Sequence, residues 1–67
     1  MNRRELIWKK KVKIHELKQQ LAASDYKAIK FAEGELTTAE YAPAREERRS
    51  LRAQIRALES ELKTLEG

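Results

Sequence analysis

The feature that most constrains this chain is a heptad repeat of large aliphatic residues in its second half. The repeat consists of residues spaced alternately four and three apart: Leu51, Ile55, Leu58, Leu62 and Leu65. This spacing places them along one side of a helix and is typical of a coiled-coil seam, with Ile55 and Leu62 at position a and the others at position d. The intervening residues are good helix formers. We therefore predict a helix over residues 43–66, about 36 Å long at 1.5 Å per residue.

The start of this helix carries two competing signals. Residues Thr37 to Glu40 fit a capping box, in which the Thr hydroxyl and the Glu carboxylate each accept a hydrogen bond from the other residue's backbone. Pro43 argues for a later start, because a Pro inside a helix lacks the backbone donor and clashes with the preceding turn. We predict a short helical turn over 38–42, a break before Pro43 and then the long helix, with a kink at Pro43 as the alternative.

The first half of the chain is periodic on two sides of one helix. One stripe provides the other half of the hairpin seam: Ile7, Ile14, Leu17, Leu21 and Ala28. A second stripe lies nearly opposite: Trp8, Val12, His15, Ala22, Tyr26 and Ile29. Two apolar sides need more contact than a simple hairpin supplies. Trp8 either packs inside the hairpin or forms, with Val12, Ala22, Tyr26 and Ile29, an interface with another subunit or protein. We favour the interface, where large aromatic side chains are enriched.

Glycine and capping signals divide the two halves. Ser24 or Asp25 is a candidate N-cap, and Gly34 is a candidate left-handed residue that closes the first helix. We predict one nearly continuous helix over residues 4–33, because the helical phase persists across residue 24. An end near 23 with a restart is the alternative. The turn over 34–37 is short, so the two helices should be antiparallel neighbours.

The charge distribution favours the same antiparallel hairpin. Residues 1–30 carry nine Lys or Arg and three Asp or Glu, whereas residues 31–67 carry six and eight. A fold that reverses at 34–37 places the basic start beside the acidic end. Ala, Glu, Lys, Leu and Arg make up 42 of the 67 residues, a composition typical of coiled coils and long helices. The predicted fold class is therefore all-α, an antiparallel helical hairpin with coiled-coil packing.

The length of the chain limits how much it can bury alone. With 67 residues it forms one domain at most, and a lone core of this size is marginal. The free energy gained by burying the apolar residues of a single hairpin seam is small compared with the conformational entropy lost when the chain is ordered. We therefore predict a homo-oligomer, with a dimer favoured, in which two hairpins form a four-helix bundle.

Catalytic and cofactor chemistry finds little support in these residues. The chain has no Cys and a single His, so thiolate sites and a two-His zinc site are excluded. His15 and Glu16 are adjacent and would point about 100° apart on a helix. We predict no enzymatic activity, no cofactor and no metal. The longest apolar run is three residues, too short for a membrane span or a secretory signal, so we expect a cytoplasmic protein.

Nucleic-acid binding is the alternative function that the basic residues suggest. Two clusters supply candidate phosphate contacts: Lys9, Lys10, Lys11, Lys13, Arg48 and Arg49. A basic helix can follow a phosphate backbone, and Trp8 adds a ring on which a base could stack. The lysines nevertheless surround the helix and do not line one face. A solubilising role, paired with the acidic end of the chain, is the simpler interpretation.

One stretch of the sequence resembles a known group of proteins. The segment SDYKAIKFAEGEL at 24–36, followed by EYAP at 40–43, is similar to a pattern in small phage and prophage coiled-coil proteins of Gram-positive bacteria. It also resembles C-terminal coiled-coil segments of phage tail-associated proteins. The resemblance covers residues 15–60. It implies a phage or prophage structural or accessory module, located in the cytoplasm of a bacterial host or in the virion, whose partner is another copy or another phage or host protein. It implies no catalytic or binding residues.

Overall fold

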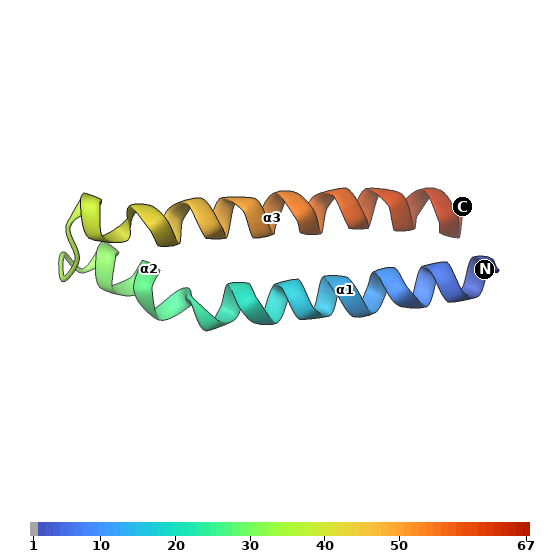
Figure 1. The fold of residues 1–67 in the computed structure, drawn as a ribbon, viewed down its shortest axis with the longest axis horizontal. Coiled ribbons are helices and arrows are strands. Elements are labelled where there is room, and N and C mark those ends of the chain that lie inside the picture. Colours follow the sequence, from blue (N-terminus) through green and yellow to red (C-terminus); the bar gives the residue numbers. More distant parts are fainter. Residues whose placement is uncertain (1) are drawn as a thin grey trace.

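The computed structural model describes residues 2–67, which form three helices in a single hairpin (Figure 1). Helix α1 spans Arg3–Ala23, α2 spans Asp25–Ala32 and α3 spans Thr38–Glu66. α1 and α2 together make the first arm, and α3 returns alongside them, so that the two termini lie at the same end. The molecule measures 48 × 16 × 15 Å. The described part of the chain has no strand, which confirms the predicted all-α helical hairpin.

The first arm is broken at Ser24, so the prediction of a nearly continuous helix over 4–33 is wrong and its alternative is correct. The backbone angles of Ser24 are φ −98° and ψ 1°, and its N–H donates to the carbonyl of Leu21 at 3.1 Å. The Ser24 hydroxyl donates to the same carbonyl at 2.9 Å. Such local side-chain hydrogen bonds compete with the helical pattern and favour a helix end. In Figure 1, α2 turns toward α3 after this break.

The end of α2 has the hydrogen bonds of a Schellman motif. The Gly34 N–H donates to the carbonyl of Phe31 at 3.1 Å, and the Glu35 N–H donates to the carbonyl of Lys30 at 2.8 Å. This motif requires a left-handed residue, and Gly34 has φ +81°. The predicted role of Gly34 as the closing residue is confirmed.

Helix α3 starts at the capping box, earlier than predicted. Thr37 Oγ1 accepts from the Glu40 N–H at 3.1 Å, and Glu40 Oε1 accepts from the Thr37 N–H at 2.9 Å. The predicted break before Pro43 is wrong, because α3 continues through this residue. Pro43 cannot donate to the carbonyl of Ala39, but both residues are exposed, so water can bind that carbonyl.

The core of the hairpin lies between α1 and α3. Its buried members all belong to the seam predicted from the sequence: Ile14, Leu17, Leu51, Ile55 and Leu62. Ile7, Leu21 and Leu58 are half-buried against this cluster. Leu65, near the open end, is half-buried. The interior is a single line of side chains between two arms.

The turn end of the hairpin is closed by aromatic packing. The rings of Phe31 on α2 and Tyr41 on α3 stack with centroids 4.5 Å apart and an angle of 8° between their planes. The Arg45 guanidinium lies over both rings, 5.2 Å from the centroid of Phe31 and 5.5 Å from that of Tyr41. These contacts fix the bent α2 against the start of α3.

Candidate interaction surfaces

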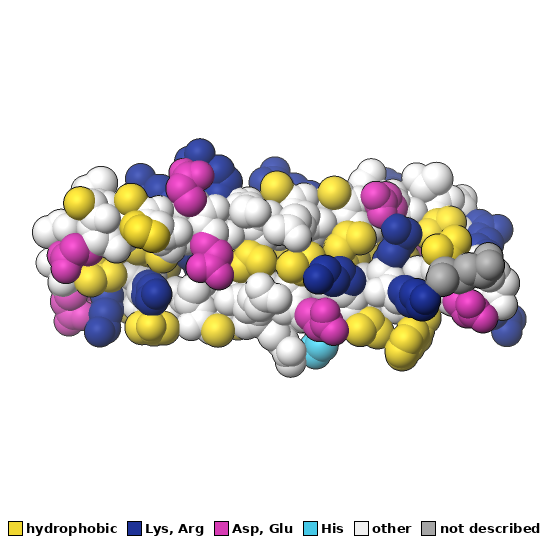
Figure 2. Space-filling model, in the orientation of Figure 1, with side chains coloured by type: hydrophobic (Ala, Val, Ile, Leu, Met, Phe, Trp, Pro, Cys, Tyr) yellow, Lys and Arg dark blue, Asp and Glu magenta, His cyan; other side chains and the backbone are white. Residues whose placement is uncertain are grey.

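The second stripe of the first arm is exposed. We call its five proposed interface residues the outer stripe: Trp8, Val12, Ala22, Tyr26 and Ile29. The exposed fractions are 66% for Trp8, 55% for Tyr26 and 57% for Ile29, and Val12 is half-buried. Trp8 therefore does not pack inside the hairpin. Figure 2 shows hydrophobic side chains along the lower edge of the molecule, on the side of the first arm.

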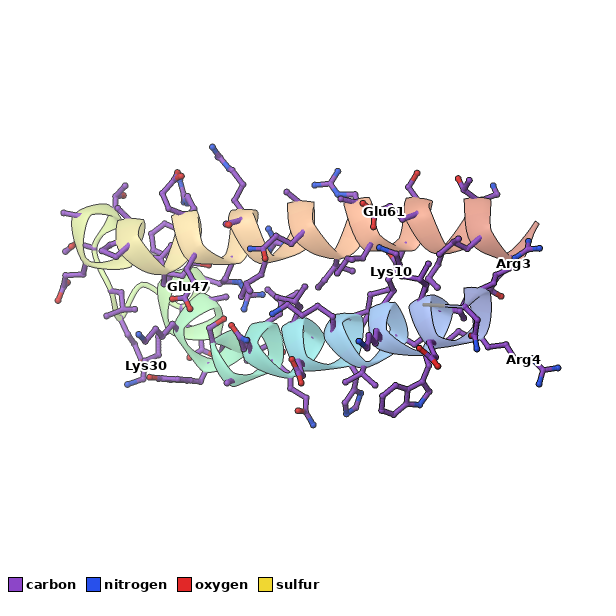
Figure 3. All side chains as sticks on the ribbon, turned by 45° about the vertical axis from the view of Figure 1, so that its right-hand side comes forward. Arg3, Arg4, Lys10, Lys30, Glu47 and Glu61 are labelled. Atoms are coloured by element: carbon purple, nitrogen blue, oxygen red, sulfur yellow. The ribbon has the colours of Figure 1, made fainter. Side chains whose placement is uncertain are left out.

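The basic start and the acidic end of the chain are joined by ion pairs. Lys10 Nζ lies 2.5 Å from Glu61 Oε2, and the two side chains point toward one another in Figure 3. Two further pairs link α1 to α3, Lys18 to Glu59 at 3.7 Å and Lys11 to Glu66 at 4.0 Å. All three pairs are at least partly exposed, and each contributes only about 0–1 kcal/mol. Together they favour the antiparallel pairing of α1 with α3 over other arrangements of the two helices.

Most of the cations proposed to contact nucleic acid have other partners in the hairpin. Lys10 and Lys11 pair with glutamates of α3, and Arg49 lies 3.6 Å from Glu46 of its own helix. Lys9 and Lys13 are exposed, and no ion pair engages them within residues 2–67. Arg48 is buried. Of the six residues, Lys9 and Lys13 therefore remain as those that could contact a phosphate backbone without the loss of an ion pair.

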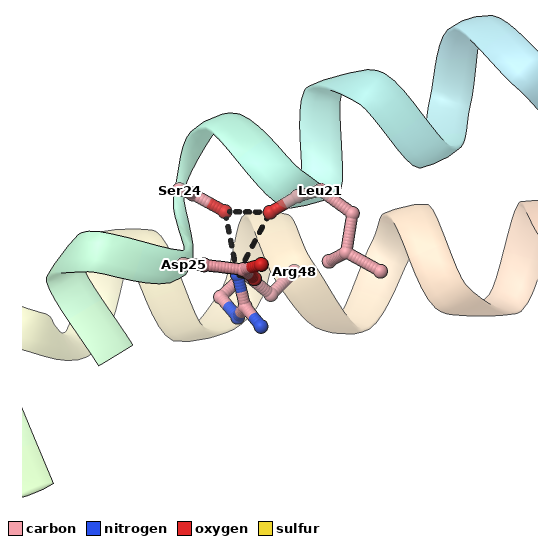
Figure 4. A network of polar contacts seen from close by, with 4 residues as sticks. All are labelled: Leu21, Ser24, Asp25 and Arg48. Carbon is pink, nitrogen blue, oxygen red and sulfur yellow. Dashed lines mark hydrogen bonds and ion pairs between the residues drawn. The ribbon is translucent and has the colours of Figure 1, made fainter. Parts of the chain in front are cut away.

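Arg48 lies inside the hairpin and not on its surface. Its exposed fraction is 8%, and Nη1 donates to three acceptors at the break of the first arm (Figure 4). These are the carbonyl of Leu21 at 2.9 Å, the hydroxyl of Ser24 at 2.8 Å and the carboxylate of Asp25 at 2.9 Å. Nε has no partner among the described residues. Because burial removes Arg48 from solvent, it is not accessible to a phosphate, which corrects its assignment to the nucleic-acid contacts.

The sequence held a signal for this role of Arg48. Continued backward from Leu51, the heptad seam places Arg48 at a position a, where a side chain faces the other arm. The sequence predicts Ser24 or Asp25 as an N-cap, and Ser24 takes that position before α2 without a capping hydrogen bond from its side chain. Their contact with Arg48 was missed, because a pairing across two arms depends on the hairpin register.

A shallow groove lies beside the aromatic packing at the turn end. It is lined by residues of α2, the turn and α3: Tyr26, Lys27, Lys30, Leu36, Glu40, Tyr41, Pro43 and Ala44. Lys27 and Lys30 place their Nζ atoms 6.0 and 5.9 Å from the ring centroid of Tyr26. Tyr26 therefore connects this groove to the outer stripe.

The structure offers few polar groups for chemistry. His15 is exposed on α1. Within residues 2–67, no three His, Asp or Glu side chains come together in a group that could bind a metal ion. The pKa of Glu40 lies below its ordinary value of 4.5, first because the backbone of Thr37 donates a hydrogen bond to it and then because the Thr37 side chain does, in a capping contact. None of the helices that the structure describes is long and apolar enough to cross a membrane.

Comparisons with known proteins add no family and no function to this description. No protein-family model matches the chain, and no significant match was found among curated proteins or solved structures.

Proposed function

We propose that this chain is a non-enzymatic helical module that associates with a second copy of itself. The observation that carries the proposal is the exposure of three large apolar side chains, Trp8, Tyr26 and Ile29, along one arm. Single exposed apolar residues are ordinary on protein surfaces. A row of them along a helix face is typical of an interaction site.

The small core of one hairpin supports the same proposal. Leu17 and Leu51 are its most buried members, at 3% and 4% exposed, and no large side chain among residues 2–67 is less than 2% exposed. A chain of this size gains stability from association, because a second copy covers apolar surface that one seam leaves in water. Two hairpins bring four helical arms together with coiled-coil packing, and the four-helix bundle predicted from the sequence is one arrangement of these arms.

The biological setting that we propose is a phage or prophage structural or accessory protein. This proposal rests on the resemblance of residues 15–60 to phage coiled-coil proteins. Self-association suits such a role. A small helical module of this kind holds the subunits of a phage assembly together, or joins the assembly to another phage or host protein.

Sedimentation of the purified chain and two variants tests the proposal. Trp8→Ser removes the largest side chain of the outer stripe, whereas Gln20→Ser changes an exposed residue outside it. The parent and the control should sediment as oligomers at concentrations where Trp8→Ser has the mass of one chain. The melting temperature of the parent should also rise with concentration, as mass action requires. A parent that stays monomeric throughout would overturn the proposal.

Nucleic-acid binding is separated from self-association by a gel shift at several salt concentrations. Phosphate contacts release counterions, so binding through them weakens steeply between about 50 and 200 mM salt. The ion pairs of Lys10 and Lys11 argue against this activity. We expect no retention of single- or double-stranded DNA by the hairpin.

A further inference from the structure

The outer stripe belongs to a complete heptad pattern on α1 and α2. Adding two exposed polar residues, His15 and Gln19, gives a spacing that alternates between four and three without interruption: Trp8, Val12, His15, Gln19, Ala22, Tyr26 and Ile29. An alternating spacing of this kind places all seven side chains along one seam that faces another helix. The first arm thus carries two seams, of which α3 covers only one. We call the uncovered one, formed by these seven residues, the outer seam.

We infer that the outer seam takes α1 of a second copy of this chain, packed antiparallel, with His15 of each copy facing Gln19 of the other. This inference rests on the proposed self-association and specifies its geometry. In a two-fold symmetric contact, each residue pair occurs twice with the partners exchanged. The same register places Trp8 opposite Tyr26 and Val12 opposite Ala22 of the second copy.

Side-chain size favours the antiparallel direction over the parallel one. Along α1 the outer seam falls in size from Trp8 through Val12 to Ala22. An antiparallel pair is symmetric about its centre, with Trp8 opposite Tyr26 at each end and Val12 opposite Ala22 further in, so the contact has the same width at both ends. A parallel pair would place Trp8 against Trp8 at one end and Ala22 against Ala22 at the other. The helices would then splay apart or leave a void, and close packing allows neither.

The bend at Ser24 supports the same register. Because α2 turns toward α3, the segment Asp25–Ala32, which carries Tyr26, recedes from the line of α1. The space opposite this receding segment suits the large indole of Trp8 from the second copy.

The basic residues at the start of α1 favour this direction as well. Arg4, Lys9 and Lys13 crowd the start of α1 and are exposed, without an ion pair inside the described hairpin. The antiparallel arrangement places the two basic segments at opposite ends of the contact, whereas a parallel arrangement places them together. A parallel pair would gain a contact of Lys11 with Glu16, but Lys11 already lies 4.0 Å from Glu66.

The dimer is then a layer of four arms, not a square bundle. The outer seam lies on the side of α1 that is turned away from the core, so the two α1 helices form the middle of the layer and the two α3 helices lie at its edges. The seam offers fewer residues than the 20–30 per side of a standard interface. A reversible, concentration-dependent dimer is expected.

Disulfide cross-linking tests the direction and the register, and the absence of native Cys makes it clean. His15→Cys and Gln19→Cys both alter exposed residues, so both variants should fold. The two variants are oxidised separately and as an equal mixture, at a concentration where the parent is dimeric by light scattering. In the inferred register, residues 15 and 19 face one another, whereas like residues are offset by about 6 Å along the helices and lie beyond the reach of a disulfide. The mixture should therefore cross-link several-fold faster than either variant alone.

Each other outcome overturns the inference in a distinguishable way. Rapid cross-linking of His15→Cys with itself indicates a parallel dimer and leaves the proposed self-association intact. A dimeric mass without cross-linking in any sample indicates that another surface is used. A monomeric parent contradicts the proposed function as well.

A charge variant gives a second, independent measurement. The inferred register brings Glu16 of the two copies close together across the two-fold axis, so Glu16→Gln should lower the Kd of the dimer by up to about fivefold. In a parallel dimer, Glu16 would lie beside Lys11 of the other copy, and the same variant would raise the Kd. An increased Kd overturns the inference.

Discussion

The stability of the break in the first arm should depend on Asp25 more than on the arginine that it contacts. The Arg48 side chain is only 10% exposed, and Asp25 supplies the one full negative charge among its three acceptors. Asp25→Ala leaves this buried cation with a carbonyl and a hydroxyl. A hydrogen bond to a charged group contributes about 1.5–3 kcal/mol, and solvent weakens this one because the Asp25 side chain is 56% exposed. We expect the free energy of unfolding to fall by about 1–2 kcal/mol.

Arg48→Met is the matched variant, and its effect should be smaller. Met fills similar space in the seam, and Nε, which has no partner among residues 2–67, is no longer buried. The acceptors that remain are not stranded, since the Ser24 hydroxyl still donates to Leu21 and water reaches Asp25. Replacement of a buried ion by an apolar side chain of similar volume is often neutral or stabilising, so we expect a change within about 1 kcal/mol.

Thermal unfolding followed by far-ultraviolet circular dichroism measures both effects at one protein concentration. For a domain of this size, about 1 kcal/mol corresponds to about 4–8 °C. Asp25→Ala should therefore melt about 4–16 °C below the parent. In the Arg48→Met background, the same Asp25→Ala change should have little effect, because the two residues then no longer interact. A melting temperature of Asp25→Ala at or above that of Arg48→Met would refute this reasoning.

Three further predictions address the rest of the hairpin. Leu51→Ala, at 4% exposure, should lower the free energy of unfolding by about 2–5 kcal/mol in urea titrations, whereas the exposed Gln54→Ala should cost less than about 0.5 kcal/mol, and equal midpoints would contradict the seam. Gly34→Ala should cost about 1–2 kcal/mol through its positive φ alone, since nothing lies within 4 Å of the added Cβ, and an unchanged melting temperature would speak against the Schellman motif. Folding lowers the pKa of Glu40, so its carboxylate stabilises the fold above the ordinary value of 4.5, and this contribution is lost as the pH falls through the folded pKa. The melting temperature of the parent should therefore fall relative to that of Glu40→Gln over this acid range. A difference in melting temperature that does not change with pH would contradict this sign.

The parts of the fold that depend on local or periodic signals could be predicted from the sequence. The seam around Leu51 and Ile55 follows from the spacing of apolar residues, and the turn at Gly34 follows from its freedom to adopt a positive φ. The break at Ser24 is the less favoured of two sequence predictions, because the apolar stripes keep one helical phase across residue 24. The sequence signal of Pro43 overstates its effect on the helix, since a missing donor costs less where the freed carbonyl faces water.

The interaction surfaces show a similar division. The exposure of Trp8 follows from its angular distance from the seam, which the sequence provides. Charge alone was misleading for Arg48, because a basic cluster in the sequence does not reveal which of its members the hairpin buries. The ion pair of Lys10 with Glu61 fits the predicted placement of the basic start beside the acidic end, whereas the choice of these two partners depends on the hairpin register.

The most direct test of the central claim uses the fluorescence of Trp8, the only Trp in the chain. In the isolated hairpin its side chain is 66% exposed, so dilute protein should emit at long wavelength and be quenched readily by acrylamide. If the outer stripe is the self-association surface, a rising protein concentration should shift the emission to shorter wavelength and reduce the quenching. Both changes should follow the increase in mass toward twice the 7.8 kDa of one chain. A Trp8 that stays equally exposed while the mass doubles, or a mass that never rises, would contradict the account.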